Sequence, residues 1–268
     1  MRIEKIGLGD SASLTVYLLD DSPEVAIHDR PMVIVCPGGA YCSLSDREGE
    51  PVAMQFTAMG YHSAVLRYSV APARHPAALL ELGRAVATVR SHAGRWCVDG
   101  RRIAVLGFSA GGHLAALYCT QWRKPWLSEC LACKSAELAP DAMILCYPVV
   151  SAGEYAHDGS FMNLLGDDWK SLKDGLSVEK LVSADVPPAF IWHTFEDSIV
   201  PVQNSLLMAR ALADCNVPVE LHIFQNGDHG LALADELGRR VDGSLCEPSC
   251  QVWIRLLHVW LERWRKGL

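Results

Sequence analysis

The sequence has no long apolar run and no cluster of basic residues, and each absence excludes a class of function. No stretch of the 268 residues is apolar over the length of a bilayer span, so we expect no membrane partner. The net charge is −7 and the Lys and Arg residues are scattered, which argues against nucleic acid, whose phosphates require a basic surface. Residues 1–21 carry acidic side chains and no apolar core of signal-peptide length, so we expect a cytoplasmic protein.

The cysteines lack the pattern of a metal site or of a disulfide framework. There are ten of them, and in a cytoplasmic protein their thiols stay reduced. The pairs Cys130/Cys133 and Cys246/Cys250 have a loosely zinc-like spacing, but neither has a histidine at zinc-finger distance. We therefore expect no metal and no organic cofactor, and the role of the two pairs stays open. Other cysteines lie in apolar segments and are typical of small core residues: Cys36, Cys97, Cys119 and Cys146.

Short apolar strands alternate with amphipathic helical stretches along most of the chain. The strands are apolar at consecutive positions, which is typical of strands buried on both faces. This alternation predicts an α/β protein with a mostly parallel central sheet and helices on both faces. No repeat or linker divides the chain, so we expect one domain over residues 1–268. The expected strands are 13–19, 32–39, 62–70, 102–108, 141–150, 188–195 and 219–224, and the expected helices are 75–96, 109–119, 200–216 and 248–264.

One long segment interrupts this alternation. Residues 151–188 are polar and rich in turn-forming residues, with only short amphipathic pieces. Connections of this length inside a domain are usually functional, so we predict a small cap or lid beside the active site. Residues 121–140 are similarly irregular, and the sequence suggests no role for them.

A serine lies between a predicted strand and a predicted helix, within the sequence Gly107-Phe108-Ser109-Ala110-Gly111. In a Gly-x-Ser-x-Gly turn the glycines avoid collisions between strand and helix, and the strained serine projects its hydroxyl above the sheet. The helix N-terminus below it favours negative charge. A helix-capping serine would explain the same residue. Because a strand precedes the pentapeptide and a helix follows it, we predict that Ser109 is a nucleophile.

A serine nucleophile needs hydrogen-bond donors for the oxyanion that its attack creates. The strand at 32–39 ends in Pro37-Gly38-Gly39-Ala40-Tyr41, whose small residues let backbone N–H groups face a substrate oxygen. We assign the oxyanion hole to the amides of Gly39 and Ala40, together with the amide of Ala110 after the nucleophile.

The serine also needs a base, and the base needs an acid that orients it. His229 follows the last strand between turn residues, and Asp197 follows the strand at 188–195, so both fit the chain order serine, acid, histidine. The adjacent Glu196 is the alternative acid. Eight other histidines lack such a setting: His28, His75, His92, His113, His157, His193, His222 and His258.

With these residues identified, the chain resembles the α/β-hydrolase superfamily over nearly its whole length. Within it, the sequence is most similar to compact bacterial esterases of the acetyl-xylan-esterase-like and hormone-sensitive-lipase-like groups. The resemblance rests on residues 37–41, 68–79, 107–113, 193–212 and 227–233. Lipase-like members usually have His-Gly-Gly-Gly at the oxyanion loop, whereas this chain has Pro37 and Ala40 at the first and last of those positions. The proline form is more similar to the sugar-esterase branch.

The resemblance implies an α/β-hydrolase fold and a serine esterase that works by two-step acyl transfer without a cofactor. It implies a small-molecule ester as substrate, with a short acyl group such as acetyl on a sugar or xylo-oligosaccharide. Tyr41 beside the oxyanion loop and Trp169 in the predicted lid are candidates for stacking on a sugar ring, and packing would explain either residue equally well.

Two other functions fit parts of the pattern. A serine peptidase similar to the prolyl-oligopeptidase group would share the fold, although such enzymes usually carry an extra domain. A non-catalytic binding protein on a hydrolase fold would be expected to have a damaged triad, and no damage is visible. The sequence leaves open the acyl acceptor, the acyl chain length, any movement of the lid and the oligomeric state, a homodimer included.

Overall fold

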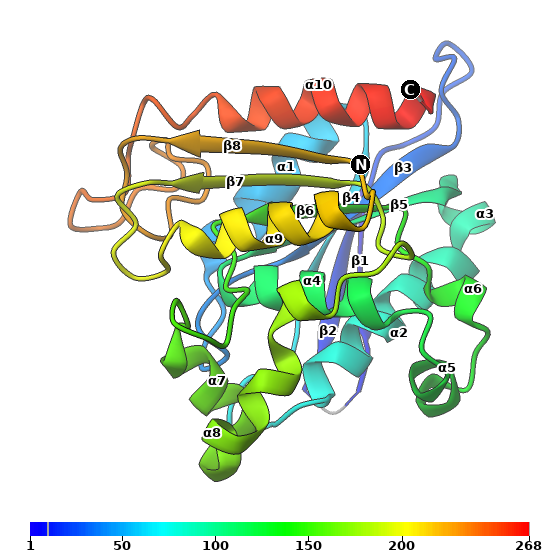
Figure 1. Cartoon of the computed structure of the whole chain (residues 1–268). Helices are drawn as coiled ribbons and strands as arrows, with labels where there is room; N and C mark the ends of the chain where they lie inside the picture. The colour runs from blue at the N-terminus through cyan, green and yellow to red at the C-terminus, as the bar shows by residue number, and fades with distance from the viewer. Residues whose placement is uncertain (10, 268) are drawn as a thin grey trace.

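A mixed sheet of eight strands forms the centre of the computed structural model, which describes residues 1–9 and 11–267 (Figure 1). The strand order is β1-β2-β4-β3-β5-β6-β7-β8. The pairs β1–β2 and β2–β4 are antiparallel, and the other neighbouring strands are parallel. The strands are β1 (Arg2–Gly7), β2 (Ser13–Leu18), β3 (Arg30–Cys36), β4 (His62–Arg67), β5 (Val98–Phe108), β6 (Ala142–Cys146), β7 (Ala189–Thr194) and β8 (Val219–Phe224).

The central strands are apolar throughout because both of their faces are covered. In β3, Met32 and Ile34 belong to the core on one side of the sheet, whereas Val33 and Val35 belong to the core on the other. Successive side chains of a strand point to opposite faces, so burial of both faces requires a continuous apolar run. The predicted, mostly parallel sheet with two covered faces is therefore confirmed.

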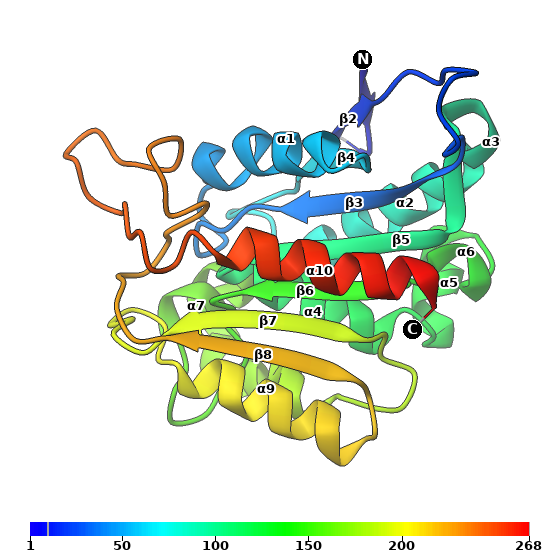
Figure 2. The ribbon, with the colours of Figure 1, turned by 90° about the horizontal axis from the view of Figure 1, so that it is seen from above.

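Helices cover both faces of the sheet. Buried side chains of α1 and α10 join the core on one face, and those of α2, α4 and α9 join the core on the other. Figure 2 shows α1 and α10 in front of the sheet, on the first face. The helices are α1 (Glu50–Ala58), α2 (Ala77–Ser91), α3 (Ala93–Trp96), α4 (Ala110–Gln121), α5 (Pro125–Leu131), α6 (Ser135–Leu138), α7 (Asp158–Leu165), α8 (Trp169–Leu172), α9 (Gln203–Asp214) and α10 (Trp253–Lys266).

Several short elements differ from the prediction or were absent from it. The expected helix 75–96 is divided at His92 into α2 and α3. Helix α1 was not predicted because its nine residues show only a little more than two turns of periodicity. Residues 121–140 contain α5 and α6, which at seven and four residues are too short for the pattern to reveal.

The segment 151–188 consists of short helical turns. It contains α7 and α8 and the 3-10 turns η2 (Gly166–Asp168), η3 (Lys173–Leu176) and η4 (Val178–Lys180). A further 3-10 turn, η1 (Asp46–Glu48), follows β3. Asn163 in α7 donates a hydrogen bond to the carbonyl of Ala40 in the loop after β3, at 2.9 Å. The loops after β3, β5, β7 and β8 leave the same edge of the sheet, because parallel strands end on one side (Figure 1).

Candidate active site

Ser109 lies between the end of β5 and the start of α4, in a backbone conformation that serine rarely adopts. Its φ is 51° and its ψ is −117°. Non-glycine residues held in such regions cost roughly 1–3 kcal/mol, so the surrounding structure must impose the conformation. Ser109 occupies the N-cap position of α4, but its side chain forms no capping hydrogen bond. The capping interpretation of this serine is therefore excluded.

The two glycines of the pentapeptide are required by close backbone contacts. A Cβ on Gly107 would overlap the carbonyl oxygen of Gly111, and a Cβ on Gly111 would overlap the carbonyl oxygen of Cys36 in β3. Strand β5, helix α4 and strand β3 thus approach one another more closely than any side chain at these positions would allow. These two contacts fix the backbone of Ser109 at the edge of the sheet, where its hydroxyl projects away from the strands.

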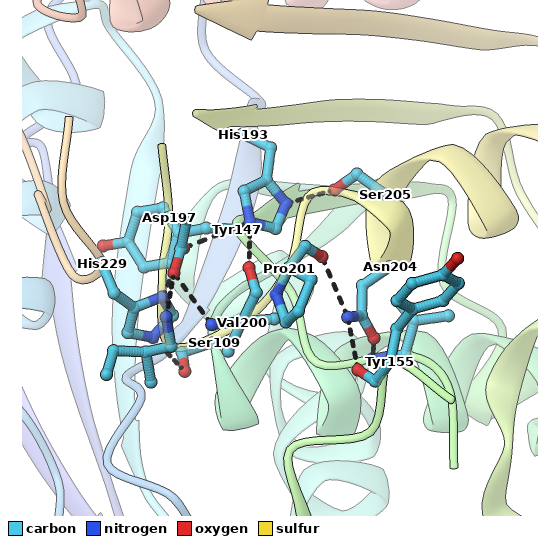
Figure 3. Close-up of polar contacts among 12 residues, drawn as sticks. Ser109, Tyr147, Tyr155, His193, Asp197, Val200, Pro201, Asn204, Ser205 and His229 are labelled. Carbon is cyan, nitrogen blue, oxygen red and sulfur yellow. Dashed lines mark hydrogen bonds and ion pairs between the residues drawn. The ribbon is translucent and has the colours of Figure 1, made fainter. Parts of the chain in front are cut away.

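Three polar side chains from different loops meet above the sheet (Figure 3). Ser109 Oγ lies 2.8 Å from His229 Nε2, and His229 Nδ1 lies 2.6 Å from Asp197 Oδ2. The ionised carboxylate of Asp197 can only accept, so Nδ1 of His229 carries the proton and donates it. The other ring nitrogen, Nε2, is then the acceptor for the Ser109 hydroxyl. The imidazole is thus in the tautomer that a general base requires.

Asp197 is buried yet fully hydrogen-bonded. Its Oδ1 accepts from the N–H groups of Ile199 (3.0 Å) and Val200 (2.8 Å), and its Oδ2 accepts from His193 (3.2 Å) and His229. Burial alone would raise the pKa of this carboxyl, but the hydrogen bonds from His193 and His229 lower the pKa well below its usual range. Asp197 is therefore ionised at neutral pH.

Two amide N–H groups in the loop after β3 point away from the hydrogen bonds that the carbonyls of this loop accept. The carbonyl of Gly38 accepts from Ser45, and the carbonyl of Gly39 accepts from Cys42 and Ser43. In a trans peptide the N–H points opposite to the carbonyl, so the N–H groups of Gly39 and Ala40 face the other way. Within the described residues neither N–H has a protein acceptor, and the same is true of Ala110 at the start of α4.

Several of these residues line one pocket of about 360 Å³. Its lining includes Gly39, Ala40, Ser109 and His229, together with His157 from the segment 151–188. A slightly larger hollow, of about 430 Å³, lies between α10 and β8, but its lining contains none of the polar groups that meet at Ser109. The chemistry therefore favours the smaller pocket as the site.

A profile of the BD-FAE family matches residues 21–212, which is most of the chain and includes Ser109 and Asp197. The chain belongs to the BD-FAE family.

The BD-FAE chain is similar to several proteins of solved structure. It is 38% identical to the acetyl ester-xyloside bifunctional hydrolase from Caldicellulosiruptor lactoaceticus, with a TM-score of 0.82 over 97% of this chain and 95% of that one. It is 31% identical to the carboxylesterase Cest-2923 from Lactobacillus plantarum WCFS1, with a TM-score of 0.87 over 100% and 98% of the two chains. It is also 32% identical to MGS-M1, an alpha/beta hydrolase enzyme from a Medee basin deep-sea metagenome library, with a TM-score of 0.80 over 99% of this chain and 98% of that one. Together with the strand order, these likenesses confirm the α/β-hydrolase fold.

A curated relative is much longer than the BD-FAE chain. Endo-1,4-beta-xylanase B from Butyrivibrio fibrisolvens is 35% identical over 234 residues. The match covers 84% of this chain but only 35% of the xylanase.

The structure corrects the prediction for Tyr41. Its ring is 2% exposed and packs edge-on against Tyr68 and His113, and its hydroxyl lies 2.9 Å from His113 Nδ1. A ring buried in this way has no face for a sugar, so the residue packs in the core of the BD-FAE chain. Trp169 is half-buried in α8, with Lys170 and Lys173 above its ring, and it is not among the residues that line the pocket.

The structure also distinguishes between the two candidate acids. Glu196 is exposed, and its carboxylate lies 3.4 Å from the backbone nitrogen of Gly227. Asp197 alone of the two contacts His229.

Four residues of the site were missed or set aside in the sequence. His193 contacts Asp197, and His157 lines the pocket. Glu48 and Tyr147 lie between the loop after β3 and the loop that carries His229. His193 and Tyr147 follow apolar residues of buried strands, and a local pattern cannot distinguish such residues from packing residues. Only a weak sequence signal points to Glu48, which is an acidic residue between a glycine-rich loop and the start of a helix.

The remaining sequence hypotheses concern metals and membranes. Within residues 1–9 and 11–267, no three His, Cys, Asp or Glu side chains are grouped as metal ligands would be, and the four cysteines of the two spaced pairs are free thiols. None of the helices in the described part of the chain is both long and apolar enough to cross a membrane.

Proposed function

We propose that this BD-FAE chain is a serine carboxylesterase that hydrolyses short-chain esters, acetyl esters of sugars or xylo-oligosaccharides above all. The observation that carries the proposal is the chain of contacts from Ser109 Oγ through His229 to Asp197, at 2.8 and 2.6 Å, beside three unpaired amides. The names of the similar proteins, an acetyl ester-xyloside hydrolase and a carboxylesterase, support the same class of reaction.

The first half-reaction forms an acyl-enzyme. Ser109 Oγ attacks the ester carbonyl while His229 Nε2 takes the hydroxyl proton. The carbonyl oxygen becomes an oxyanion, which accepts hydrogen bonds from the amides of Gly39, Ala40 and Ala110. Collapse of this intermediate breaks the bond to the alcohol oxygen, and His229 gives that oxygen its proton.

The second half-reaction releases the acid. Water gives a proton to His229 and attacks the acyl carbon, the same amides hold the second oxyanion, and Ser109 regains its proton as the acid leaves. Asp197 stays ionised throughout and stabilises the imidazolium that forms in each half-reaction. None of these steps requires a metal or an organic cofactor.

We further propose that residues 151–188 form a small cap on a single domain. Helix α7 supplies the Asn163 bond to Ala40, and His157 at its N-terminus lines the pocket. The segment therefore borders the site on the side of the oxyanion loop.

A substrate panel tests the proposed function and separates it from peptidase activity. Acetate release is measured from O-acetylated xylo-oligosaccharides, other acetylated sugars and simple alkyl acetates, and the release of new amino groups is measured from short peptides. We expect acetate release with turnover from the acetylated sugars and none from the peptides. Cleavage of peptides alone would favour the peptidase alternative, and no turnover of any member would favour the non-catalytic one.

Acyl chain length provides a second prediction. The pocket of about 360 Å³ is lined mostly by polar side chains, so the extra carbons of an octanoyl chain would gain little from burial there. We therefore expect kcat/KM for p-nitrophenyl acetate to exceed that for the octanoate by at least about tenfold, which corresponds to about 1.4 kcal/mol. Faster cleavage of the octanoate would indicate a lipase-like tunnel instead.

Replacement of Asp197 by asparagine should lower kcat by about 10⁴-fold, because an amide can donate to His229 Nδ1 and so stabilise the wrong tautomer. Glu196→Gln is the matched control, since it changes the neighbouring carboxylate that does not contact His229. We expect it to retain nearly full activity toward p-nitrophenyl acetate. The reverse pattern would assign the acid to Glu196.

A further inference from the structure

Glu48 is a buried carboxylate that the reaction described above does not use. It ends the turn η1 and is 3% exposed, although it lies at the edge of the pocket. Within the described part of the chain it forms no ion pair. A buried charge without such a partner is expensive unless hydrogen bonds satisfy it, so its contacts indicate what it does.

The two oxygens of Glu48 bind two different parts of the site. Oε2 accepts from the backbone N–H of Gly38, at 2.8 Å, at the start of the oxyanion loop. Oε1 accepts from the hydroxyl of Tyr147, at 2.7 Å. That hydroxyl in turn accepts from the N–H of Ala232 in the loop of His229, at 2.8 Å. The ring of Tyr147 also packs edge-on against the ring of His229, with 5.2 Å between centroids.

The packing around Glu48 leaves little room for these parts to shift. A Cβ on Gly38 would lie 2.9 Å from Glu48 Oε2 and 3.0 Å from Ser109 Cβ, so the carboxylate, the loop and the nucleophile are in close contact. Arg47, its neighbour in η1, donates to the carbonyl of Gly238, at 2.7 Å, on the chain that follows His229. The turn η1 is thus bonded both to the oxyanion loop and to the region after β8.

We propose that Glu48 is a positioning residue that fixes the oxyanion loop relative to His229 through Gly38 on one oxygen and Tyr147 on the other. The proposal rests on the proposed esterase function of the same site. The amides of Gly39 and Ala40 must meet the oxyanion while His229 meets the Ser109 hydroxyl, and these groups come from loops that are far apart in the sequence. A misplacement of about 1 Å between such groups can lower turnover by about 10²-fold.

The test combines Glu48→Gln and Tyr147→Phe, singly and together, with p-nitrophenyl acetate as substrate. A glutamine at position 48 has only one acceptor oxygen, so either the Gly38 N–H or the Tyr147 O–H loses its acceptor. We expect kcat to fall by about 10²-fold in each single variant while KM changes by less than about threefold. The double variant should be no slower than the slower single one, because both changes interrupt the same chain of contacts.

The Ki of a transition-state analogue is a measurement that would not change if Glu48 had a purely structural role. Methyl trifluoromethyl ketone adds to a serine hydroxyl, whose oxygen bonds to the carbonyl carbon while the carbonyl oxygen becomes an oxyanion and the proton passes to the histidine. Its Ki should rise by the same factor as kcat/KM falls, since the adduct needs both the amides and His229 in place. Tyr118→Phe is the matched control, because it removes another buried tyrosine hydroxyl, bonded to Leu138 away from the site. It should leave kcat and Ki unchanged.

Two results would overturn the proposal. One is a folded Glu48→Gln enzyme with wild-type kcat and Ki. The other is a fall in kcat that Tyr118→Phe shows to the same extent, against the expectation for that control. If Glu48→Gln does not fold, Tyr147→Phe, which removes a single oxygen atom, decides the question on the same criteria. Failure of the esterase proposal is distinguishable, because the wild-type protein would then show no turnover that depends on Ser109.

Discussion

Replacing Ser109 by alanine is expected to lower kcat for p-nitrophenyl acetate by about 10⁶-fold, the loss seen when a triad serine is removed from a serine hydrolase. The reason is that no other hydroxyl is in contact with His229 Nε2 in the described residues. What remains should be the slow attack of water, assisted by the oxyanion amides and by binding. The comparison requires purified protein and rates corrected for spontaneous hydrolysis.

Ser43→Ala is the matched control for the serine variant. Ser43 lines the same pocket, but its hydroxyl lies toward the carbonyl of Gly39 rather than toward His229. Its removal should change kcat far less than the removal of Ser109. Equal rates for wild type and Ser109→Ala would show that Ser109 is not the nucleophile and would favour a non-catalytic role for the pocket.

Replacing His229 by alanine should lower kcat by a similar factor, about 10⁶-fold, because a serine hydroxyl without its base is barely nucleophilic and the triad acts as a unit. For the same reason the Ser109→Ala/His229→Ala double variant should be no slower than either single one. The measurement is again turnover of p-nitrophenyl acetate, at a pH where spontaneous hydrolysis is slow.

His157→Ala is the control for the histidine variant, since His157 is the other histidine that lines the pocket. Its Nδ1 accepts from the backbone N–H of Ser160 and caps α7, which ties the ring to the helix rather than to Ser109. We expect a far smaller loss for His157→Ala than for His229→Ala. A loss below about tenfold in His229→Ala would mean that another residue is the base.

The sheet could be predicted because burial of both faces requires a sequence pattern that is easy to recognise. A strand such as β3 has to be apolar at every position, and that pattern is visible without the structure. Among the helices that were missed, α1, α5 and α6 are short, and their burial depends on elements that are distant in the sequence. Short helices of this kind are decided by tertiary packing, which a local pattern does not contain.

The residues Ser109, Asp197 and His229 could be proposed together because the fold limits where a triad can lie. Each follows a predicted strand, and the carboxyl ends of parallel strands share one edge of the sheet. The glycines around Ser109 added a local signal, since they mark close backbone contacts. The same reasoning selected Gly39 and Ala40, whose small size leaves their amides accessible.

The supporting residues could not be predicted, because their roles depend on contacts between distant segments. Glu48 meets Tyr147 across 99 positions of sequence, and His193 differs from a packing histidine only through its contact with Asp197. Tyr41 shows the opposite error. It adjoins the loop after β3 in sequence, but its side chain is buried in the core, where its hydroxyl donates a hydrogen bond to His113 Nδ1.

The most direct test of the central claim, that Ser109 is a nucleophile activated by His229, is a covalent label located by peptide mass spectrometry. A fluorophosphonate reacts with an activated serine by forming a phosphorus–oxygen bond and releasing fluoride. Our account predicts one label per chain, on Ser109, with little labelling of the His229→Ala protein and none of the Ser109→Ala protein. Labelling on another residue, or labelling of Ser109 that is equally fast without His229, would contradict it.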